Sequence, residues 1–389
     1  MTTALPECRS YRSVLVAENR EQYVEQLRIA LEKKHDPDYL EVLQREAKEN
    51  TWDARVEAIL TPLLADADLR ERHGIGGRFP RAVRRHFSPN KGHPMYDIWL
   101  EFALSTNRRG LAAVETVQRY TSVPGKRVLD VGCAYGGFAI AFAKSGGEAV
   151  GIDIDPALLE LAADNVHDMG AAVSLYRKDI TDWTHLKDLG AFDIITCNDL
   201  IEHVDDVRGA LEHIAFLLKP GGHLYLQIPN ACSVGQVLKD GHYGLFGITL
   251  LSRQDAIRYF SESGYNDSYG VGYFHRLGAY IEMLGQHRIA LHNGEILNSS
   301  ESLKERIDRM RPSLELIRNR LSGCLDDNGL SVETKQALTD AVNEYVDQVT
   351  SDFRAYDATA DEGLKSQRAW GLVKSYDIEF WEMLCVKGN

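Results

Sequence analysis

The sequence predicts an α/β protein whose core is a mainly parallel β-sheet with helices on both faces. Short runs rich in valine and isoleucine alternate with helical segments between residues 126 and 230, which is typical of strand–helix–strand units. A glycine-rich turn follows the first of these runs. Helical patterns occupy most of the chain before residue 120 and between residues 286 and 370. The sheet region is therefore expected to carry a helical extension before it and a helical insertion within it.

The first 120 residues are expected to form a helical N-terminal region. Apolar residues recur there at helical spacing, and Pro37 separates the first two helices. The helices expected are 18–34, 39–48, 51–64 and 95–120. The stretch from Leu69 to Pro94 is rich in arginine, glycine and proline, which indicates a loop with one short helix.

Residues 121–285 are expected to form the sheet core. The apolar runs in this region are short and bounded by turn residues, as strands are. The strands expected are 126–131, 149–154, 173–176, 192–197, 223–228 and 267–274, and the helices expected are 138–144, 156–168, 207–218 and 252–263.

Residues 286–370 are expected to form a helical insertion before the last strand. In 301–322 and 332–356 the apolar residues follow one another at spacings of four and three, which favours an antiparallel hairpin with coiled-coil-like packing. Pro312 would kink the first helix or mark its start. The insertion is interpreted as a lid or as a contact in a homo-oligomer. Residues 371–389 then return to the core with a final strand.

Composition argues against several classes of protein. The chain of 389 residues has 57 Asp and Glu against 44 Lys and Arg, a net charge of -13, and this acidic excess disfavours binding to long nucleic acids. Its longest weakly polar run, 131–143, is shorter than the roughly 20 residues that span a bilayer, and the N-terminus lacks the apolar stretch of a secretory signal. The six cysteines form no Cys-x-x-Cys pair, as expected for a reduced, cytoplasmic protein.

The glycine-rich turn after the first strand is the strongest sign of a ligand site. The segment from Val128 to Gly137 reads VLDVGCAYGG, so that a strand ends near Asp130 and glycines lead into a helix. Glycines allow the backbone to approach a ligand closely and leave the first helical amides free. The acidic Asp130 suits a ligand with a cationic or amine-bearing end better than it suits a diphosphate.

Two further acidic residues follow the next strands. Asp153 ends the second strand in GID, where a carboxylate can accept hydrogen bonds from both hydroxyls of a ribose. Asp179 follows the third strand, where it could contact an adenine amino group. Together with the glycine turn, these residues predict a pocket for an adenosine that carries a charged amino-acid tail.

The motifs resemble those of the class I S-adenosylmethionine-dependent methyltransferases, and most closely the ubiquinone-biosynthesis-like branch that acts on small molecules. The resemblance covers about residues 125 to 285. It rests on four motifs in the family's order and spacing, which are VLDVGCAYGG, GIDIDP, FDIITCNDLIEHV and LLKPGGHLYLQIPN.

The resemblance implies a Rossmann-like sheet of seven strands, the last of them antiparallel, and S-adenosylmethionine as cofactor with S-adenosylhomocysteine as product. It implies these cofactor-binding residues: Asp130, Gly132, Ala134, Gly136, Asp153, Ile154, Asp179, Ile180 and Asn198. Ala134 stands where the family often has a third glycine. The expected reaction is methyl transfer to a small-molecule or glycan-type acceptor, with oxygen as the favoured acceptor atom.

The residues that act on the acceptor are less distinctly marked. His203 and His242 are candidates for a general base that activates a hydroxyl, although both could instead be structural. Tyr243 and His275 are candidate acceptor contacts in loops that follow the fifth and sixth strands expected here. Arg84 and Arg85 belong to an arginine-rich stretch that could capture an anionic acceptor group or could simply be solvated. The resemblance allows a divalent metal with Asp and Glu ligands, but no spacing specifies such a site and no metal-ligating residues are assigned.

Three other functions are compatible with parts of the pattern. An NAD(P)-dependent oxidoreductase is disfavoured because the Gly-x-Gly-x-x-Gly motif is missing and Asp130 stands in the turn. A non-catalytic cofactor-binding scaffold would use the long helices to recruit a partner. A protein or RNA methyltransferase would use the arginine-rich stretch for docking, and the acidic net charge makes this the weakest alternative.

Overall fold

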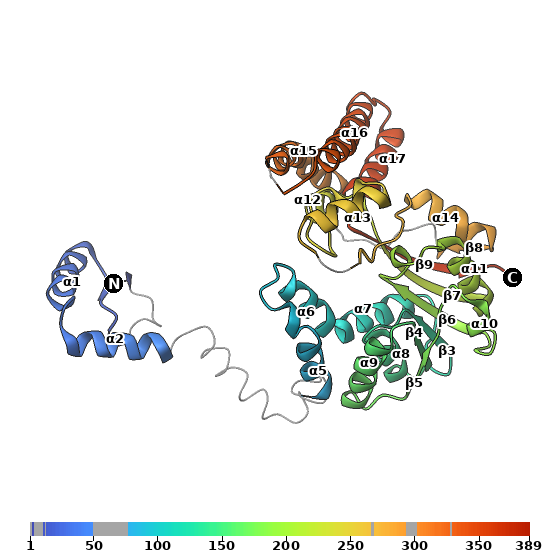
Figure 1. Cartoon of the computed structure of the whole chain (residues 1–389), viewed down its shortest axis with the longest axis horizontal. Coiled ribbons are helices and arrows are strands. Elements are labelled where there is room, and N and C mark those ends of the chain that lie inside the picture. Colours follow the sequence, from blue (N-terminus) through green and yellow to red (C-terminus); the bar gives the residue numbers. More distant parts are fainter. Residues whose placement is uncertain are drawn as a thin grey trace. The chain divides into compact units, whose positions relative to one another are not determined.

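The computed structural model describes residues 2–3, 11, 13–49, 77–265, 268–292, 302–326 and 329–389. The chain divides into two compact units, Met1–Gly76 and Gly77–Asn389 (Figure 1). Among the described residues, no helix combines the length and apolar character needed to cross a membrane.

The first unit contains two of the expected helices. Helix α1 spans Arg20–Lys33 and begins after Asn19, whose side chain accepts a hydrogen bond from the backbone amide of Gln22. Helix α2 spans Pro37–Glu49, and the proline stands at the start of this helix, where its missing N–H costs nothing. Two short parallel strands, β1 (Thr2–Thr3) and β2 (Val16–Ala17), accompany them. The helix expected over 51–64 lies outside the described residues.

The second unit is built around a seven-stranded sheet. Its strands are β3 (Arg127–Val131), β4 (Glu148–Asp153), β5 (Val173–Arg177), β6 (Phe192–Asn198), β7 (Leu218–Pro229), β8 (Ile289–Leu291) and β9 (Phe380–Lys387). Their order in the sheet is β5-β4-β3-β6-β7-β9-β8, and among these seven strands β9 alone runs in the opposite direction. The prediction of a seven-stranded sheet with an antiparallel last strand is therefore confirmed.

Helices cover both faces of this sheet. The shorter ones are α5 (Arg78–His86), α6 (Tyr96–Leu104), α7 (Thr106–Gln118), α8 (Gly137–Lys144), α9 (Pro156–Asp168), α10 (Trp183–Leu186), α11 (Val207–Leu217), α12 (Val234–Leu238), α13 (Arg253–Glu262) and α14 (Leu277–Gln286). Val128 and Ile194 point to one face and pack with apolar residues of α7 and α8. Leu129 and Ile195, one position further along their strands, point to the other face and join a larger core with α11 and α14. This alternation follows from the two-residue period of a strand.

The sixth strand predicted at 267–274 is wrong. Residues 268–276 have no regular structure, because their backbone bonds to groups of other loops. The amide of Gly272 donates to the carbonyl of Glu202, and the amide of Gly270 donates to the hydroxyl of Tyr243. The sixth strand is instead β8, so the sheet core extends beyond the predicted boundary at residue 285.

The expected N-terminal region is shared between the two units, because residues 77–120 belong to the unit that contains the sheet. Helix α7 crosses α8 in close contact. A Cβ atom on Gly110 would lie 2.3 Å from the carbonyl oxygen of Gly137, so only glycine permits this approach. Helix α5 is tied to the C-terminal end of α9 by the amide of Phe79, which donates to Asp168 over 2.8 Å.

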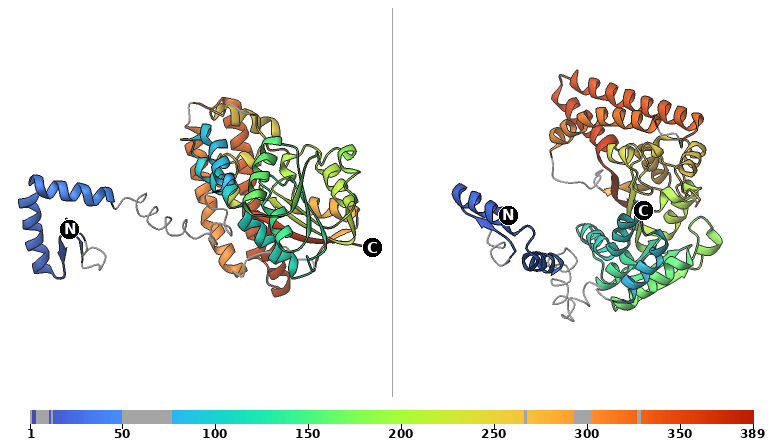
Figure 2. Two further views of the ribbon diagram at one scale, coloured as in Figure 1. Left: turned by 90° about the horizontal axis from the view of Figure 1, so that it is seen from below. Right: turned by 60° about the vertical axis from the view of Figure 1, so that its left-hand side comes forward.

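The helical insertion contains α15 (Leu303–Leu325), α16 (Val332–Asp357), α17 (Glu362–Leu372) and a π-helical turn over Val373–Asp377. Helices α15 and α16 lie side by side, as Figure 2 shows. Pro312 lies inside α15 and does not begin it. The apolar residues of the hairpin, among them Ile317 and Val342, belong to the main core of the unit. The insertion is thus packed onto the fold and not attached only by its ends.

Candidate active site

The glycine turn between β3 and α8 has three residues in the left-handed region. Gly132 has φ of 67°, Ala134 of 43° and Gly136 of 75°. Left-handed backbone is costly for residues with a Cβ, so Ala134 bears a strain that a glycine at this position would avoid. A hydrogen bond from the amide of Ala134 to Asp153 Oδ2 (2.8 Å) helps to stabilise this backbone conformation.

Asp130 is buried beneath this turn. Its Oδ1 accepts a hydrogen bond from the hydroxyl of Thr196 (2.8 Å) and its Oδ2 accepts one from the amide of Ala139 (3.2 Å). Burial raises the pKa of this carboxyl to about 7. Asp130 therefore braces β6 and the first turn of α8, and both of its oxygens are already engaged.

A cavity of about 370 Å³ lies at the carboxyl ends of β3, β4 and β6. Five of the predicted cofactor residues line it: Gly132, Asp153, Ile154, Asp179 and Ile180. Asp130, Ala134, Gly136 and Asn198 are not on its lining. The same cavity is also lined by Leu200 and His203, so that one candidate base stands at the predicted cofactor pocket.

Next to this cavity, several buried polar groups lack partners in the described part of the chain. These are Asn198 with both side-chain polar atoms, Glu202 with both carboxyl oxygens, Asp199 with Oδ1, and Arg109 with Nε. Arg109 ion-pairs with Asp199 Oδ2 (3.2 Å), and its guanidinium carbon lies 3.7 Å from the centre of the Phe102 ring. Buried polar atoms are normally hydrogen-bonded, so this cluster is a place where a ligand is expected.

Charge at this cluster is controlled by burial. Burial raises the pKa of Asp199 to about 6, although Arg109 opposes the shift. Burial and the nearby Asp199 hold the pKa of Glu202 well above its usual range. Asp199 also has a positive φ of 50°. A cationic or hydrogen-bonding ligand would satisfy these groups.

Two histidines face the Glu202 carboxyl. Glu202 Oε1 lies 3.8 Å from His203 Nε2 and 3.9 Å from His242 Nε2, and the two rings are 5.0 Å apart in an edge-to-face arrangement. His203 Nδ1 lies 2.8 Å from the carbonyl oxygen of Gly270. Burial lowers the pKa of His203, and burial together with His203 lowers that of His242 to about 3. Both imidazoles are therefore neutral at neutral pH.

Comparison with known proteins agrees with this geometry. A family profile described as a methyltransferase domain matches residues 104–268, which contain the glycine turn, Asp153, Asp179 and the histidine pair. Residues 104–268 are therefore similar to methyltransferase domains.

Curated proteins with similar sequences include ubiquinone biosynthesis O-methyltransferases. The protein of Coxiella burnetii is 36% identical over 114 residues, which are 29% of this chain and 48% of the relative. That of Methylococcus capsulatus is 33% identical over 117 residues, 30% of this chain and 49% of the relative. The chain thus spans about half the length of these relatives. Among solved structures, magnesium protoporphyrin IX methyltransferase of Synechocystis PCC 6803 aligns with a TM-score of 0.40 at 14% identity, over 58% of this chain and 92% of that chain.

The structure places the predicted acceptor residues in different surroundings. Tyr243 adjoins His242 and packs among Phe260, Tyr265 and Tyr269. His275 is exposed and lines a second cavity, at the edge of the helical insertion.

Arg84 and Arg85 are exposed on α5 and line neither of these cavities. Arg84 donates a hydrogen bond to the carbonyl of Pro80 in its own helix. Neither cavity therefore supports the prediction that Arg84 and Arg85 bind an anionic group of the acceptor.

Arg109, Asp199 and Glu202 are not among the site residues predicted from the sequence. Asp199 and Glu202 follow the fourth strand, where ligand groups gather in parallel sheets, and that position was a usable signal. No signal in the sequence marked Arg109, because it is one of several arginines in helical segments. Only the packing of α7 brings it to Asp199.

Proposed function

We propose that this protein transfers the methyl group of S-adenosylmethionine to an oxygen atom of a small-molecule acceptor and releases S-adenosylhomocysteine. One observation carries the proposal: His203 lines the cavity that holds the predicted cofactor residues and also belongs to the Glu202–His242 cluster. A proton acceptor therefore lies beside the place where the cofactor would be held. The curated relatives named above are O-methyltransferases, which supports oxygen as the acceptor atom.

In this proposal the cofactor is held from three sides. Asp153 accepts hydrogen bonds from the ribose hydroxyls, and Asp179 and Ile180 flank the adenine. Gly132 leaves room for the methionine portion. Arg109 provides the positive charge that the methionine carboxylate requires, because it is a partly buried cation whose buried Nε atom has no partner among the described residues.

The role of Arg109 predicts a selective loss of affinity in an Arg109→Gln variant. S-adenosylhomocysteine should bind about 10-fold more weakly, a loss of about 1.4 kcal/mol, because the carboxylate loses its charge partner. Methylthioadenosine, which lacks the amino-acid tail, should bind as before. Isothermal titration of both ligands measures this. Arg108→Gln, which changes the exposed neighbour, is the matched control. Equal weakening of both ligands would show that Arg109 has only a structural role.

The chemical step requires mainly correct placement, since the sulfonium already makes the methyl group electrophilic. The enzyme must hold the acceptor oxygen in line with the methyl carbon and remove its proton. His203 and His242 are neutral near pH 7, because burial lowers the pKa of each. Each can therefore accept a proton from a hydroxyl.

The same cluster supports a second way of activating the acceptor. Donor atoms of Glu202, His203 and His242 all lie within 4.8 Å of one another, and carboxylate and imidazole are common ligands of divalent transition metals. The two unpartnered oxygens of buried Glu202 fit a cation. The sequence suggested no metal site, because Glu202–His203 and His242 are separated along the chain. A bound divalent cation would lower the pKa of an acceptor hydroxyl.

Removal of metal tests this second way. If a cation is used, dialysis against a chelator should abolish methyl transfer, and adding back Zn²⁺, Mn²⁺ or Mg²⁺ should restore it. Direct titration of the metal-free protein with each ion should show binding that a Glu202→Gln variant loses. Affinity for S-adenosylhomocysteine should change little. Full turnover after chelation, with no ion found by elemental analysis, would leave the histidines as the only candidates for activation.

The test of the overall proposal is transfer of label from methyl-labelled S-adenosylmethionine into a host cell extract. Separation into small-molecule, lipid, glycan, protein and RNA fractions then identifies the acceptor class. Label in the small-molecule fraction supports the proposal. Label in the glycan, protein or RNA fraction would show that the acceptor belongs to that class and is not a small molecule. Verified cofactor binding without any methyl transfer would favour a non-catalytic role.

A further inference from the structure

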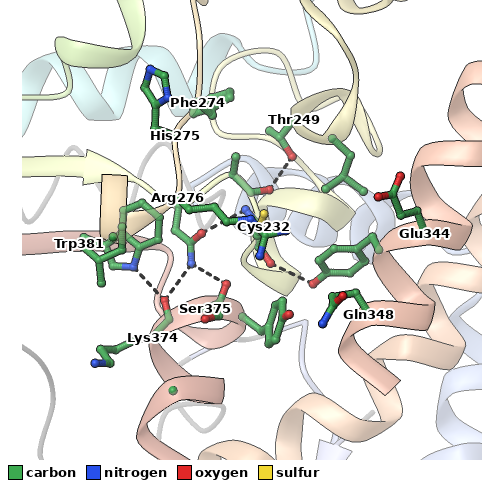
Figure 3. A pocket seen from close by; sticks show the side chains of 18 of the residues that line it. Cys232, Thr249, Phe274, His275, Arg276, Glu344, Gln348, Lys374, Ser375 and Trp381 are labelled. Carbon is green, nitrogen blue, oxygen red and sulfur yellow. Dashed lines mark hydrogen bonds between the residues drawn. The ribbon is translucent and has the colours of Figure 1, made fainter. Parts of the chain in front are cut away.

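A second cavity, of about 720 Å³, lies between the helical insertion and the part of the sheet where β7 ends and β9 begins. Five segments form it: the loop after β7, the residues leading into α14, helix α16, the turn after α17 and the start of β9 (Figure 3). This cavity is larger than the predicted cofactor cavity, and it shares none of the lining residues of that cavity. Its volume falls in the range of about 300–1,000 Å³ that is usual for small-molecule sites.

The walls of this second cavity are held by hydrogen bonds within the protein. The side-chain amide of buried Asn230 donates to the carbonyls of Ser375 (3.0 Å) and Ile378 (2.8 Å). The indole of Trp381 donates to the carbonyl of Lys374, and the hydroxyl of Tyr345 donates to the carbonyl of Cys232. These bonds join the insertion to the sheet, so the cavity is preformed.

The charges at the second cavity favour an anion. Arg276 and Lys374 line it, and neither has a carboxylate within ion-pair distance among the described residues. Arg276 reaches toward Cys232 in the middle of the site, whereas Glu344 stands on the opposite wall (Figure 3). The ammonium of Lys374 lies 5.7 Å from the centre of the Trp370 ring. Helix α14 also begins at the cavity with Leu277, and its N-cap makes no side-chain hydrogen bond. The side chain of Lys374 runs away from Arg276 (Figure 3), so the positive end of the helix dipole adds mainly to the charge of Arg276.

The remaining lining is largely aromatic and aliphatic. It includes Phe274, Leu277, Ile281, Tyr345, Tyr376 and Trp381. An apolar cavity with a few converging polar groups suits a ligand with one polar end and a flat, apolar body.

We propose that this cavity binds an aromatic small molecule that carries an acidic group, with the acid at Arg276 and the ring against Phe274 and Trp381. The loop that ends at Arg276 also passes the Glu202–His203–His242 cluster: the carbonyl oxygen of Gly270 contacts His203, and the amide of Gly272 donates to the carbonyl of Glu202. Resting on the function proposed above, the ligand is the methyl acceptor, and the cavity holds its non-reacting, anionic end.

The test uses binding, so that it does not depend on methyl transfer. The full-length protein is titrated with the fluorescent aromatic sulfonate 1-anilinonaphthalene-8-sulfonate and, separately, with the uncharged N-phenyl-1-naphthylamine. An Arg276→Gln variant should bind the sulfonate about 10-fold more weakly and the uncharged probe as before. Arg318→Gln, which changes an exposed arginine of α15, should change neither. Benzoate and phenyl phosphate, added as competitors, distinguish a carboxylate from a phosphate as the preferred acid.

The outcomes separate this proposal from the function. Equal sulfonate affinity in the Arg276→Gln and Arg318→Gln variants, or no sulfonate binding at all, overturns the anion site. Titration of each variant with S-adenosylhomocysteine shows whether the cofactor site is intact. Absence of methyl transfer with normal sulfonate binding would overturn the catalytic function and leave the anion site standing.

Discussion

A Gly132→Ala variant is expected to lose affinity for S-adenosylhomocysteine by 100-fold or more, about 2.7 kcal/mol. Gly132 has φ of 67°, and an added Cβ would lie 2.8 Å from the methyl carbons of Leu200. Backbone strain of about 1–2 kcal/mol adds to this clash. Since both residues line the predicted cofactor cavity, any relaxation moves its wall. Isothermal titration measures the loss.

The matched control for this variant is Gly125→Ala. Gly125 has a similar φ of 74°, but an added Cβ would meet no heavy atom within 4 Å. This control should lower the melting temperature by an amount set by backbone strain alone and should bind the cofactor normally. Adding Leu200→Ala to Gly132→Ala should recover part of the affinity, because the clash is removed. Equal cofactor affinity in the Gly132 and Gly125 variants would refute the assignment of this turn.

A His203→Ala variant is expected to reduce kcat for methyl transfer by about 10²-fold or more, the usual contribution of a general base. Its affinity for S-adenosylhomocysteine should change by a much smaller factor. A His242→Ala variant should also lose kcat, because His242 and His203 share the Glu202 carboxyl. Single-turnover rates with the labelled cofactor and the identified acceptor measure both effects.

The pH profile separates a base from a structural role. Burial lowers the pKa of His203 below its ordinary value of 6.5, so the imidazole is neutral, and able to accept a proton, at every pH above that lowered pKa. Turnover should therefore fall only as the pH drops through it, and this inflection should be missing in the His203→Ala variant. His185→Ala, which removes an exposed histidine of α10, is the control. Normal turnover in both the His203 and His242 variants would rule out the cluster as the source of activation.

The local parts of the fold could be predicted because their signals are local. Strands β3, β4 and β6 are short apolar runs bounded by turn residues, and their predicted ends agree with the structure to within one residue. The run predicted at 223–228 lies inside the longer strand β7. The strand predicted at 267–274 is wrong, because backbone amides of this segment donate to Glu202 and Tyr243 and not to a neighbouring strand. Strand β8 is only three residues long, too short for its pattern to be distinguished from a loop.

The sequence by itself determined the sheet class, the glycine turn, the acidic residue that ends β4 and the one that follows β5. Each of these features depends only on residue types that are close together in the sequence. Only the tertiary structure decided which distant groups meet: Arg109 with Asp199, His242 with Glu202 and His203, and Arg276 with the wall of the insertion. The physical reason is that a buried charge or an unpartnered carboxyl is defined by its surroundings. Packing of helices and loops from far along the chain creates those surroundings, and residue spacing does not encode them.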